Sequence, residues 1–241
     1  MDNTATYTEQ ELVHRRSKKM LLYIGIFSIV MLFAGLTSAY IVSQADKFWV
    51  KISLPPAFYL STALIVASSF TLWMSLKSAR AGQKAQTKRY IILTIILGLA
   101  FSYCQFKGWG QLFDRGHTIH GENIFRIKGE YGKDYTFMYK GVPLDQVDGE
   151  FYAHEDKLHE KPLKDAILGS RDVASSYLIA ITVIHFLHLV GGLIYLLVVL
   201  REAHKGMYSG KNTLRLELCN TYWHFLDGLR IYLLLFLLFI H

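Results

Sequence analysis

The chain has 241 residues, of which 52% are hydrophobic and only 19% are charged. This apolar excess is larger than a soluble domain of that length needs for its core, so the composition argues against a soluble protein. The formal net charge of +7 could suit nucleic-acid binding, but the basic residues stand beside long apolar runs, and that placement is typical of a membrane protein with no nucleic-acid partner.

Long apolar runs predict the membrane-spanning helices, because about 20 helical residues cross the hydrocarbon core of a bilayer. Five such runs occur, at residues 20–44, 57–76, 90–106, 175–200 and 218–240. A basic stretch precedes the first run, but this run is too long for a signal peptide and further spans follow, so we expect an uncleaved helix. The predicted fold class is therefore all-α, a polytopic transmembrane bundle of five helices.

A long polar stretch separates the third predicted helix from the fourth. It covers residues 111–172 and divides the chain into an N-terminal part, residues 1–110, and a C-terminal part, residues 173–241. Two of its segments, residues 123–128 and 134–139, are rich in β-branched and aromatic residues and are separated by glycine, which predicts a small β-hairpin. Because disordered linkers carry few such residues, we expect this insert to be an ordered cap that contacts a partner subunit.

The distribution of lysine and arginine predicts the orientation in the membrane. Both are concentrated in the N-terminal tail, in the hinge at residues 77–89 and in the loop at residues 201–215, which a five-span chain places on one side. By the positive-inside bias, this side is the cytoplasm. We therefore expect a multi-pass protein of a bacterial inner (plasma) membrane, with a cytoplasmic N-terminus, a periplasmic insert and a periplasmic C-terminus.

Polar side chains inside a membrane span are costly, so they are the candidate site residues. In the middle of the first three predicted helices, the only polar residues are serine and threonine, which are small and carry a hydroxyl group. The fourth carries His185 and His188, three residues apart and so on one face, followed by Gly191 and Gly192, which permit close helix approach. The fifth carries a denser set around one aromatic residue: Glu217, Asn220, Trp223, His224, Asp227 and Arg230.

Two interpretations of these residues compete. His185, His188 and His224 could bind a metal ion or haem, since imidazole suits iron and copper. However, membrane di-iron enzymes need many more histidines in several clusters, and a haem needs two opposed histidines at matched depth. The favoured interpretation is a buried polar network that locks the fourth helix to the fifth and contacts lipid. It predicts no metal, no cofactor and no catalytic residue in this chain.

Asp227 is the acidic residue expected deepest in the fifth predicted helix. An unpaired charge at the centre of a bilayer costs about 2.5–3.5 kcal/mol even on insertion scales. We therefore expect Asp227 to face the protein interior and to pair with His224 or Arg230, each three residues away, or with His188 on the preceding helix.

The remaining sequence offers no enzyme motif. A glycine-rich phosphate loop, a nucleophile elbow and a paired-carboxylate site are all missing from the sequence, which suggests the partner of an enzyme rather than its active site. Four histidines of the insert have no cysteine or methionine at ligand spacing, so we expect solvated surface side chains at all of them: His117, His120, His154 and His159.

Several stretches match motifs of one membrane-protein family. Residues 222–227, YWHFLD, resemble its YWHFxD signature, and Glu217 stands where the family has a glutamate. Residues 185–192 resemble its HxLHxxxG stretch, residues 97–105 resemble its LGxxF…Q pattern, and residues 60–71 carry a similar series of small residues. In these motifs, across all five spans, the chain resembles subunit three of the haem-copper cytochrome c oxidases, in a short five-helix form.

The resemblance implies a subunit without redox cofactors that packs against the catalytic haem-copper subunit one, where haem and copper reside. In aerobic electron transport, such a subunit stabilises the catalytic subunit and supports proton uptake and oxygen access. Other oxidase subunits, phospholipids and a larger respiratory supercomplex are the further implied partners. Two alternatives remain: an accessory subunit of a quinol oxidase or nitric oxide reductase, and a free-standing haem- or iron-binding membrane enzyme.

The chain also departs from the family pattern. Longer members have seven helices, and the two that are missing here lie before the first predicted helix, so we expect partner helices or bound lipids in their place. The family's buried glutamate on that helix aligns with Ile29, which removes any role of this carboxylate. The insert is also far longer than the short loop of the family.

Overall fold

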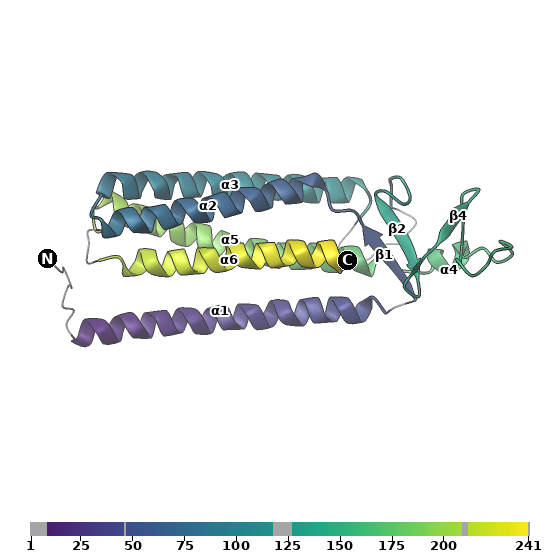
Figure 1. The fold of residues 1–241 in the computed structure, drawn as a ribbon, viewed down its shortest axis with the longest axis horizontal. Coiled ribbons are helices and arrows are strands. Elements are labelled where there is room, and N and C mark those ends of the chain that lie inside the picture. The colour runs from purple at the N-terminus through teal and green to yellow at the C-terminus, as the bar shows by residue number, and fades with distance from the viewer. Residues whose placement is uncertain (1–8, 46, 118–126, 209–211, 241) are drawn as a thin grey trace. The chain divides into compact units, whose positions relative to one another are not determined.

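Five long helices dominate the computed structural model, which describes residues 9–45, 47–117, 127–208 and 212–240. They are α1 (Glu9–Ser43), α2 (Pro56–Arg80), α3 (Lys84–Asp114), α5 (Val173–His204) and α6 (Leu214–Phe239) (Figure 1). Each is long and apolar enough to cross a membrane, which confirms the five predicted helices. All five begin before their apolar runs, and in α1, α3 and α6 the added residues include lysine, arginine or glutamate, which are good helix formers.

Short connections determine which helices are neighbours. α2 begins at Pro56, whose fixed φ suits the first turn of a helix. Only residues 81–83 separate α2 from α3, and Gly82 adopts a φ of 73° in this turn, a left-handed conformation that favours glycine. α2 and α3 therefore run antiparallel, side by side.

The helical fold also contains two small sheets, whereas the sequence predicted a single β-hairpin in the insert. β1 (Phe48–Ile52) lies between α1 and α2, in a segment that the sequence suggests is a plain loop, and it pairs antiparallel with β2 (Tyr135–Tyr139) of the insert. β2 pairs in turn with β3 (Val142–Pro143). β4 (Asp145–Val147) and β5 (Glu150–Tyr152) form the second sheet.

The predicted hairpin between residues 123–128 and 134–139 differs from the strands that the structure shows. Residues 123–126 lie outside the described residues, and residues 127 and 128 are not part of a strand. The second predicted segment does form β2, but its long partner is β1, with Val50 opposite Phe137. The tight hairpins of the insert are β2–β3 and β4–β5, and the short helix α4 (Lys164–Leu168) follows them.

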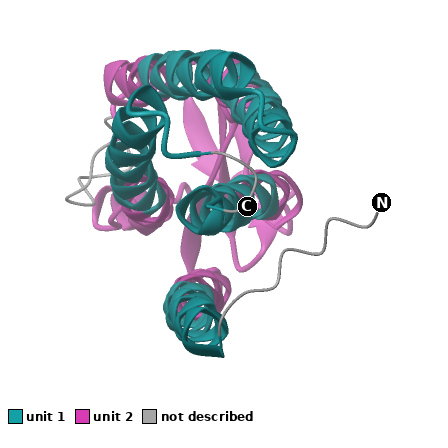
Figure 2. Cartoon of the chain, turned by 90° about the vertical axis from the view of Figure 1, so that its left-hand side faces the viewer, with its two compact units in different colours: residues 1–32, 60–104, 185–232 teal, residues 33–59, 105–184, 233–241 magenta. Residues whose placement is uncertain are grey.

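The chain falls into two compact units, to which every long helix contributes (Figure 2). Unit 1 consists of residues 1–32, 60–104 and 185–232, and unit 2 consists of residues 33–59, 105–184 and 233–241. Unit 1 has an apolar core built from α2, α3, α5 and α6, in which Leu72, Phe101, Leu196 and Trp223 are at most 1% exposed. α1 contributes no residue to this core cluster.

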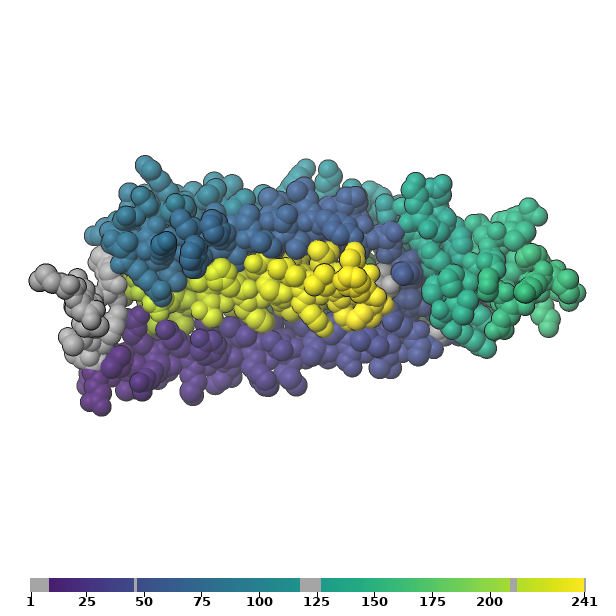
Figure 3. Space-filling model, viewed as in Figure 1, coloured from purple at the N-terminus to yellow at the C-terminus, as the bar shows by residue number. Residues whose placement is uncertain are grey.

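The α1 part of unit 1 is only loosely covered by the rest of the unit. Residues 9–32 include no buried residue, and large apolar side chains such as Leu21 and Phe27 are 72% and 65% exposed. Figure 3 shows this stretch, in purple, uncovered on the face in view. The apolar core cluster of unit 1 is therefore built by four of the five helices.

The insert in unit 2 has a small aromatic core of its own. The rings of Phe137 and Phe151 lie 5.0 Å apart, and that of Tyr131 lies 5.1 Å from Phe151. Phe137 and Phe151 are buried, and Leu144 is buried with them. These contacts account for the aromatic-rich sequence of the insert, whereas its contact with a partner subunit stays a prediction.

Tyr131→Phe should weaken this small core. The Tyr131 hydroxyl donates to the Leu144 carbonyl at 2.7 Å, and burial raises the pKa of Tyr131 to about 12 from 10.0. Removing the donor should cost about 1 kcal/mol of local stability, measured as faster amide hydrogen exchange in residues 131–152. The hydroxyl's contribution is complete below about pH 10 and is lost as the pH rises toward about 12. Tyr139→Phe, in which the ring contact with Phe48 is kept, should change the exchange little; equal effects of the two variants would contradict the expectation.

Candidate functional site

Trp223 of α6 is the centre of a buried polar network in unit 1. Its indole is 1% exposed and donates from Nε1 to Ser68 Oγ of α2 at 2.9 Å. Two glycines leave room for the ring: a Cβ added at Gly192 of α5 would lie 3.2 Å from it, and one added at Gly98 of α3 would lie 3.4 Å away. Four helices thus meet at this side chain, which explains why small residues recur on α2, α3 and α5.

Gly192→Ala should therefore disturb the network. Its new methyl group would press on Trp223 and Tyr222, and Trp223 cannot yield easily because it is buried and hydrogen-bonded to Ser68. Overpacking of this kind costs about 1–3 kcal/mol, measurable as a lower midpoint of unfolding in detergent. Gly191→Ala is the matched control, since nothing lies within 4 Å of its added Cβ. The midpoint of Gly191→Ala should be unchanged or slightly higher, and an equal loss in both variants would contradict the packing argument.

His224 follows Trp223 on α6, and Asp227 lies one turn further along the helix. The Ser69 hydroxyl of α2 lies 2.9 Å from His224 Nδ1, and Ser69 also interacts with the Asp227 carboxyl group. Asp227 is 8% exposed, and its Oδ1 atom has no hydrogen-bond partner among the described residues. Asp227 faces the protein interior, as expected from the cost of exposing a charge to lipid.

Arg230 is engaged away from Asp227. Its guanidinium donates to Ser61 Oγ at 2.9 Å and to Thr62 Oγ1 at 3.3 Å, and its Cζ atom lies 5.4 Å from the centre of the Phe101 ring. The side chain is 2% exposed.

Of the expected partners of Asp227, His224 interacts with it electrostatically and contacts the same Ser69 hydroxyl, while no direct ion pair joins Asp227 to a cation in the described part of the chain. Arg230 donates instead to Ser61 and Thr62 of α2. Spacing along one helix cannot reveal donors and acceptors that the neighbouring helix supplies.

The two histidines of α5 occupy different surroundings. His185 is 1% exposed and meets the edge of the Phe101 ring, with ring centres 6.4 Å apart, on the side of the network where Arg230 lies. His188 is half-buried, and its backbone carbonyl accepts a hydrogen bond from the Tyr222 hydroxyl at 3.1 Å. Among the described residues, no three histidine, cysteine or carboxylate side chains are grouped so that they could hold a metal ion.

Glu217 belongs to a separate ionic cluster at the beginning of α6. Its carboxylate lies 3.3 Å from Arg15 Nη2 and 3.1 Å from Lys19 Nζ, both on α1, and 3.5 Å from Arg80 Nη2 of α2. The Thr213 hydroxyl donates to it at 2.9 Å. These contacts link the N-terminal part of α1 to α6. The polar residues predicted on this helix therefore form two groups: Glu217 lies in an ionic cluster, and residues further along the helix contact hydroxyl groups of α2.

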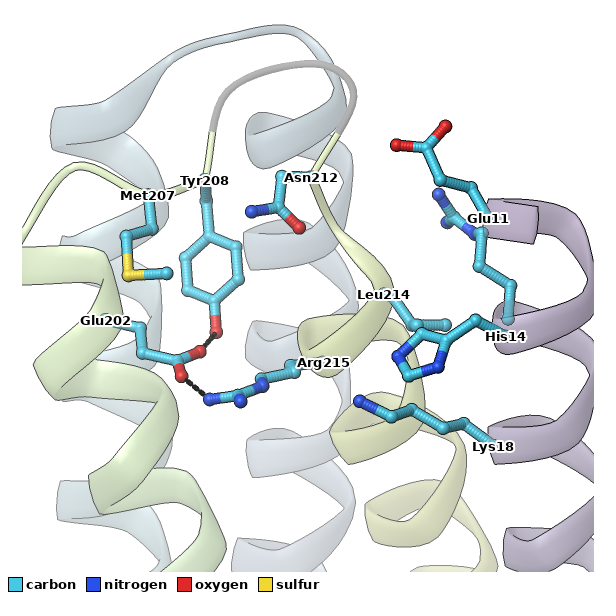
Figure 4. Close-up of a pocket in the computed structure, with 10 residues that line it drawn as sticks. Glu11, His14, Lys18, Glu202, Met207, Tyr208, Asn212, Leu214 and Arg215 are labelled. Carbon is cyan, nitrogen blue, oxygen red and sulfur yellow. Dashed lines mark hydrogen bonds and ion pairs between the residues drawn. The ribbon is translucent and has the colours of Figure 1, made fainter. Parts of the chain in front are cut away.

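Two cavities flank the Glu217 cluster. One, of about 200 Å³, is lined by Lys19, Arg80, Glu217, Asn220 and Thr221 among others. The other, of about 620 Å³, lies between α1 and the connection from α5 to α6 and is lined mainly by charged and polar side chains (Figure 4): Glu11, His14, Arg15, Lys18, Asn212 and Arg215.

Glu202 orders the wall of the larger cavity, and sequence reasoning missed it. It is 8% exposed, accepts a hydrogen bond from the Tyr208 hydroxyl at 2.7 Å and forms an ion pair with Arg215 (Figure 4). Burial raises the pKa of the Tyr208 hydroxyl, which therefore stays a donor. The available signal was that Glu202 is the single acidic residue in the basic segment 201–215.

His117 is the second residue that the sequence misplaced. It was expected at the solvated surface, but it is 1% exposed, and its Nδ1 atom lies 2.7 Å from Ser175 Oγ and 3.4 Å from Asp172 Oδ2. Asp172 in turn accepts from the Ser175 backbone N–H at 3.0 Å and caps α5, and the Ser175 hydroxyl donates to the same carboxylate. The three residues therefore join the end of α3 to the beginning of α5.

The other site residues are placed as follows. His154 is exposed and lies 2.9 Å from an Asp145 carboxylate oxygen, and His159 is exposed too, while His120 lies outside the described residues. Ile29, where the family has a glutamate, is half-buried on the apolar part of α1.

Comparisons with known proteins find relatives at low identity. No protein-family model matches the chain. Over 141 residues it is 28% identical to a protein of Mycobacterium leprae named "Probable cytochrome c oxidase subunit 3", covering 52% of this chain and 67% of that protein. Over 229 residues it is 23% identical to a protein of the same name from Nocardia farcinica, covering 89% of this chain and 86% of that one. The chain is thus a protein with five membrane-capable helices that is similar, at low identity, to curated oxidase subunits.

Proposed function

We propose that the chain is the non-catalytic subunit three of a respiratory haem-copper cytochrome c oxidase. The observation that carries the proposal is the network around Trp223. The segments that resemble the family, residues 185–192, 222–227, 97–105 and 60–71, all contribute side chains or close backbone contacts to it. The similarity to relatives named for that subunit extends over 229 residues, which supports the same assignment.

The network has a structural role in this proposal. It holds α2, α3, α5 and α6 in register through hydroxyl groups and a central indole, without a carboxylate–histidine cluster suited to a metal among the described residues. Haem and copper belong to the partner subunits, and this chain stabilises subunit one and its access for protons and oxygen. Such a role needs a rigid helical surface in the membrane rather than a reactive group.

The loosely covered α1 supplies an additional argument for partners in the membrane. Apolar side chains on several sides of its residues 20–32 are exposed, and ion pairs from Arg15 and Lys19 to Glu217 attach its N-terminal end within unit 1. In the proposed complex, helices of a partner or ordered lipids cover this stretch where longer relatives have two more helices. The basic cavity beside it, with His14, Arg15 and Lys18, suits phospholipid head groups.

Purification of the tagged chain from its native membrane tests the proposal. We expect subunit one and other oxidase subunits to copurify and the complex to show the visible spectrum of haem. The chain expressed alone should show no haem or iron absorption. Copurification of a quinol oxidase or nitric oxide reductase would instead favour the accessory-subunit alternative, and a haem spectrum of the isolated chain would favour the free-standing enzyme.

The orientation and the role of the insert are part of the same proposal. The N-terminus is cytoplasmic, and residues 111–172 and the C-terminus are periplasmic, which labelling of single introduced cysteines with a membrane-impermeant reagent checks. Deleting residues 118–168 should leave membrane insertion intact and reduce recovery of partner subunits. A deletion variant that assembles at the normal level would contradict a contact between insert and partner.

A further inference from the structure

Two buried acceptor atoms on α6 lack a hydrogen-bond partner in the described part of the chain: Asn220 Oδ1 and Asp227 Oδ1. Asn220 is 9% exposed and Asp227 is 8% exposed. Leaving such an atom unbonded costs about 1–3 kcal/mol, so buried acceptors of this kind indicate bound water or a bound proton. Their spacing of seven residues places both on the same face of the helix.

Polar groups of α6 and α2 lie between these atoms and a cavity. Asn220 and Thr221 line the cavity of about 200 Å³ beside Glu217, which has room for several waters at about 30 Å³ each. His224 is one turn beyond Asn220 and contacts the Ser69 hydroxyl, and Ser69 also interacts with the Asp227 carboxyl group. Because a hydroxyl both donates and accepts, Ser69 can pass a proton between the imidazole and the carboxyl group.

The charges around Asp227 favour a proton there. On α6 the titratable neighbours are His224 and Arg230, and Arg230 donates to Ser61 and Thr62. α2 contributes hydroxyl groups, and Phe101 of α3 is apolar. His185 of α5 lies against the edge of the Phe101 ring. Residues 24–32 of α1 include no titratable side chain. A carboxylate ionised here would be a buried charge without an adjacent cation, which the membrane interior penalises strongly.

We propose that Asp227 is a buried proton-binding site that is loaded from the Glu217 cavity through Asn220, His224 and Ser69. The bound proton occupies the Asp227 carboxyl group while the His224 imidazole is neutral. Its transfer through the Ser69 hydroxyl gives an imidazolium and a carboxylate, so the net charge of the two titrating groups is zero in both states. This inference stands on the geometry of α6 and α2 and does not require the oxidase assignment.

Infrared spectroscopy of the full-length chain in its native complex tests the protonation state. With aspartate labelled with ¹³C at the side-chain carboxyl group, the protonated C=O stretch of Asp227 should appear at neutral pH, shift with the label and vanish in Asp227→Asn. Ser69→Ala should keep the band but move its frequency, because the carboxyl group loses the hydroxyl contact. Asp145→Asn, at an exposed ion pair, is the matched control and should leave the band unchanged. If Asp227→Asn fails to assemble, the band is assigned to Asp227 from the isotope shift of the labelled wild type and from the frequency change in Ser69→Ala.

Deuterium exchange tests the route. In D₂O the Asp227 band should shift in the wild type, and Asn220→Leu should slow that shift at least about tenfold because an apolar side chain breaks the path from the cavity. Asn212→Leu, at the wall of the larger cavity, should exchange at the wild-type rate. A wild type without an aspartic-acid band, or a band that Ser69→Ala does not move, would overturn the site. Wild-type exchange in Asn220→Leu would overturn the route.

Discussion

Arg230→Ala should destabilise the protein by about 3 kcal/mol, because truncation leaves a cavity and strands the Ser61 and Thr62 hydroxyls in the membrane interior. The guanidinium is 2% exposed, donates to both hydroxyls and lies over the Phe101 ring, so a single change removes all of these contacts. The measurement is the free energy of unfolding in mixed detergent micelles, together with the recovery of the assembled complex.

Arg230→Lys separates geometry from charge at this position, and Arg201→Ala is a control at another position. Arg230→Lys keeps the charge but loses the planar fork that reaches two hydroxyls, so it should recover only part of the stability. Arg201→Ala, at an exposed position near the end of α5, should change the stability by less than about 0.5 kcal/mol. A loss of similar size in Arg201→Ala and Arg230→Ala would contradict a specific role for the buried contacts.

His117→Ala should destabilise unit 2 by about 3 kcal/mol, because it leaves the buried Asp172 carboxylate without the imidazole. His117 and Asp172 are 1% and 3% exposed, and Asp172 also caps α5 through the Ser175 N–H. The loss should appear as faster hydrogen exchange in the first turn of α5 and as a lower thermal midpoint.

His154→Ala is the matched control for His117→Ala, since it removes the same side chain from the same type of contact. The pair with Asp145 has a shorter N···O distance, 2.9 Å against 3.4 Å, but its side chains are 70% and 49% exposed. Exposed ion pairs contribute about 0–1 kcal/mol, so His154→Ala should have little effect. Equal losses in the two variants would contradict the argument that burial controls the contribution of each histidine.

The sequence alone predicted the five helices, because an apolar run long enough to cross a bilayer has few other stable conformations. It also identified most of the candidate network, since the cost of polar groups in lipid makes residues such as His185 and Asp227 conspicuous. The resemblance of residues 222–227 to a known motif pointed to the same side chains. These inferences depend on properties that each segment has by itself.

Only the tertiary structure decided which polar groups meet. His117 was read as a surface residue because nothing near it in the sequence is a ligand, yet Asp172 and Ser175, more than 50 residues away, bury it. β1 was missed because its partner β2 lies more than 80 residues further along the chain. Asp227 was expected to pair with His224, Arg230 or His188, but Arg230 donates to hydroxyls of α2, and His224 contacts Ser69, which also interacts with Asp227. In all three cases the deciding contact is long-range, and the free energy of a hydrogen bond or an ion pair depends on the neighbour that packing brings to it.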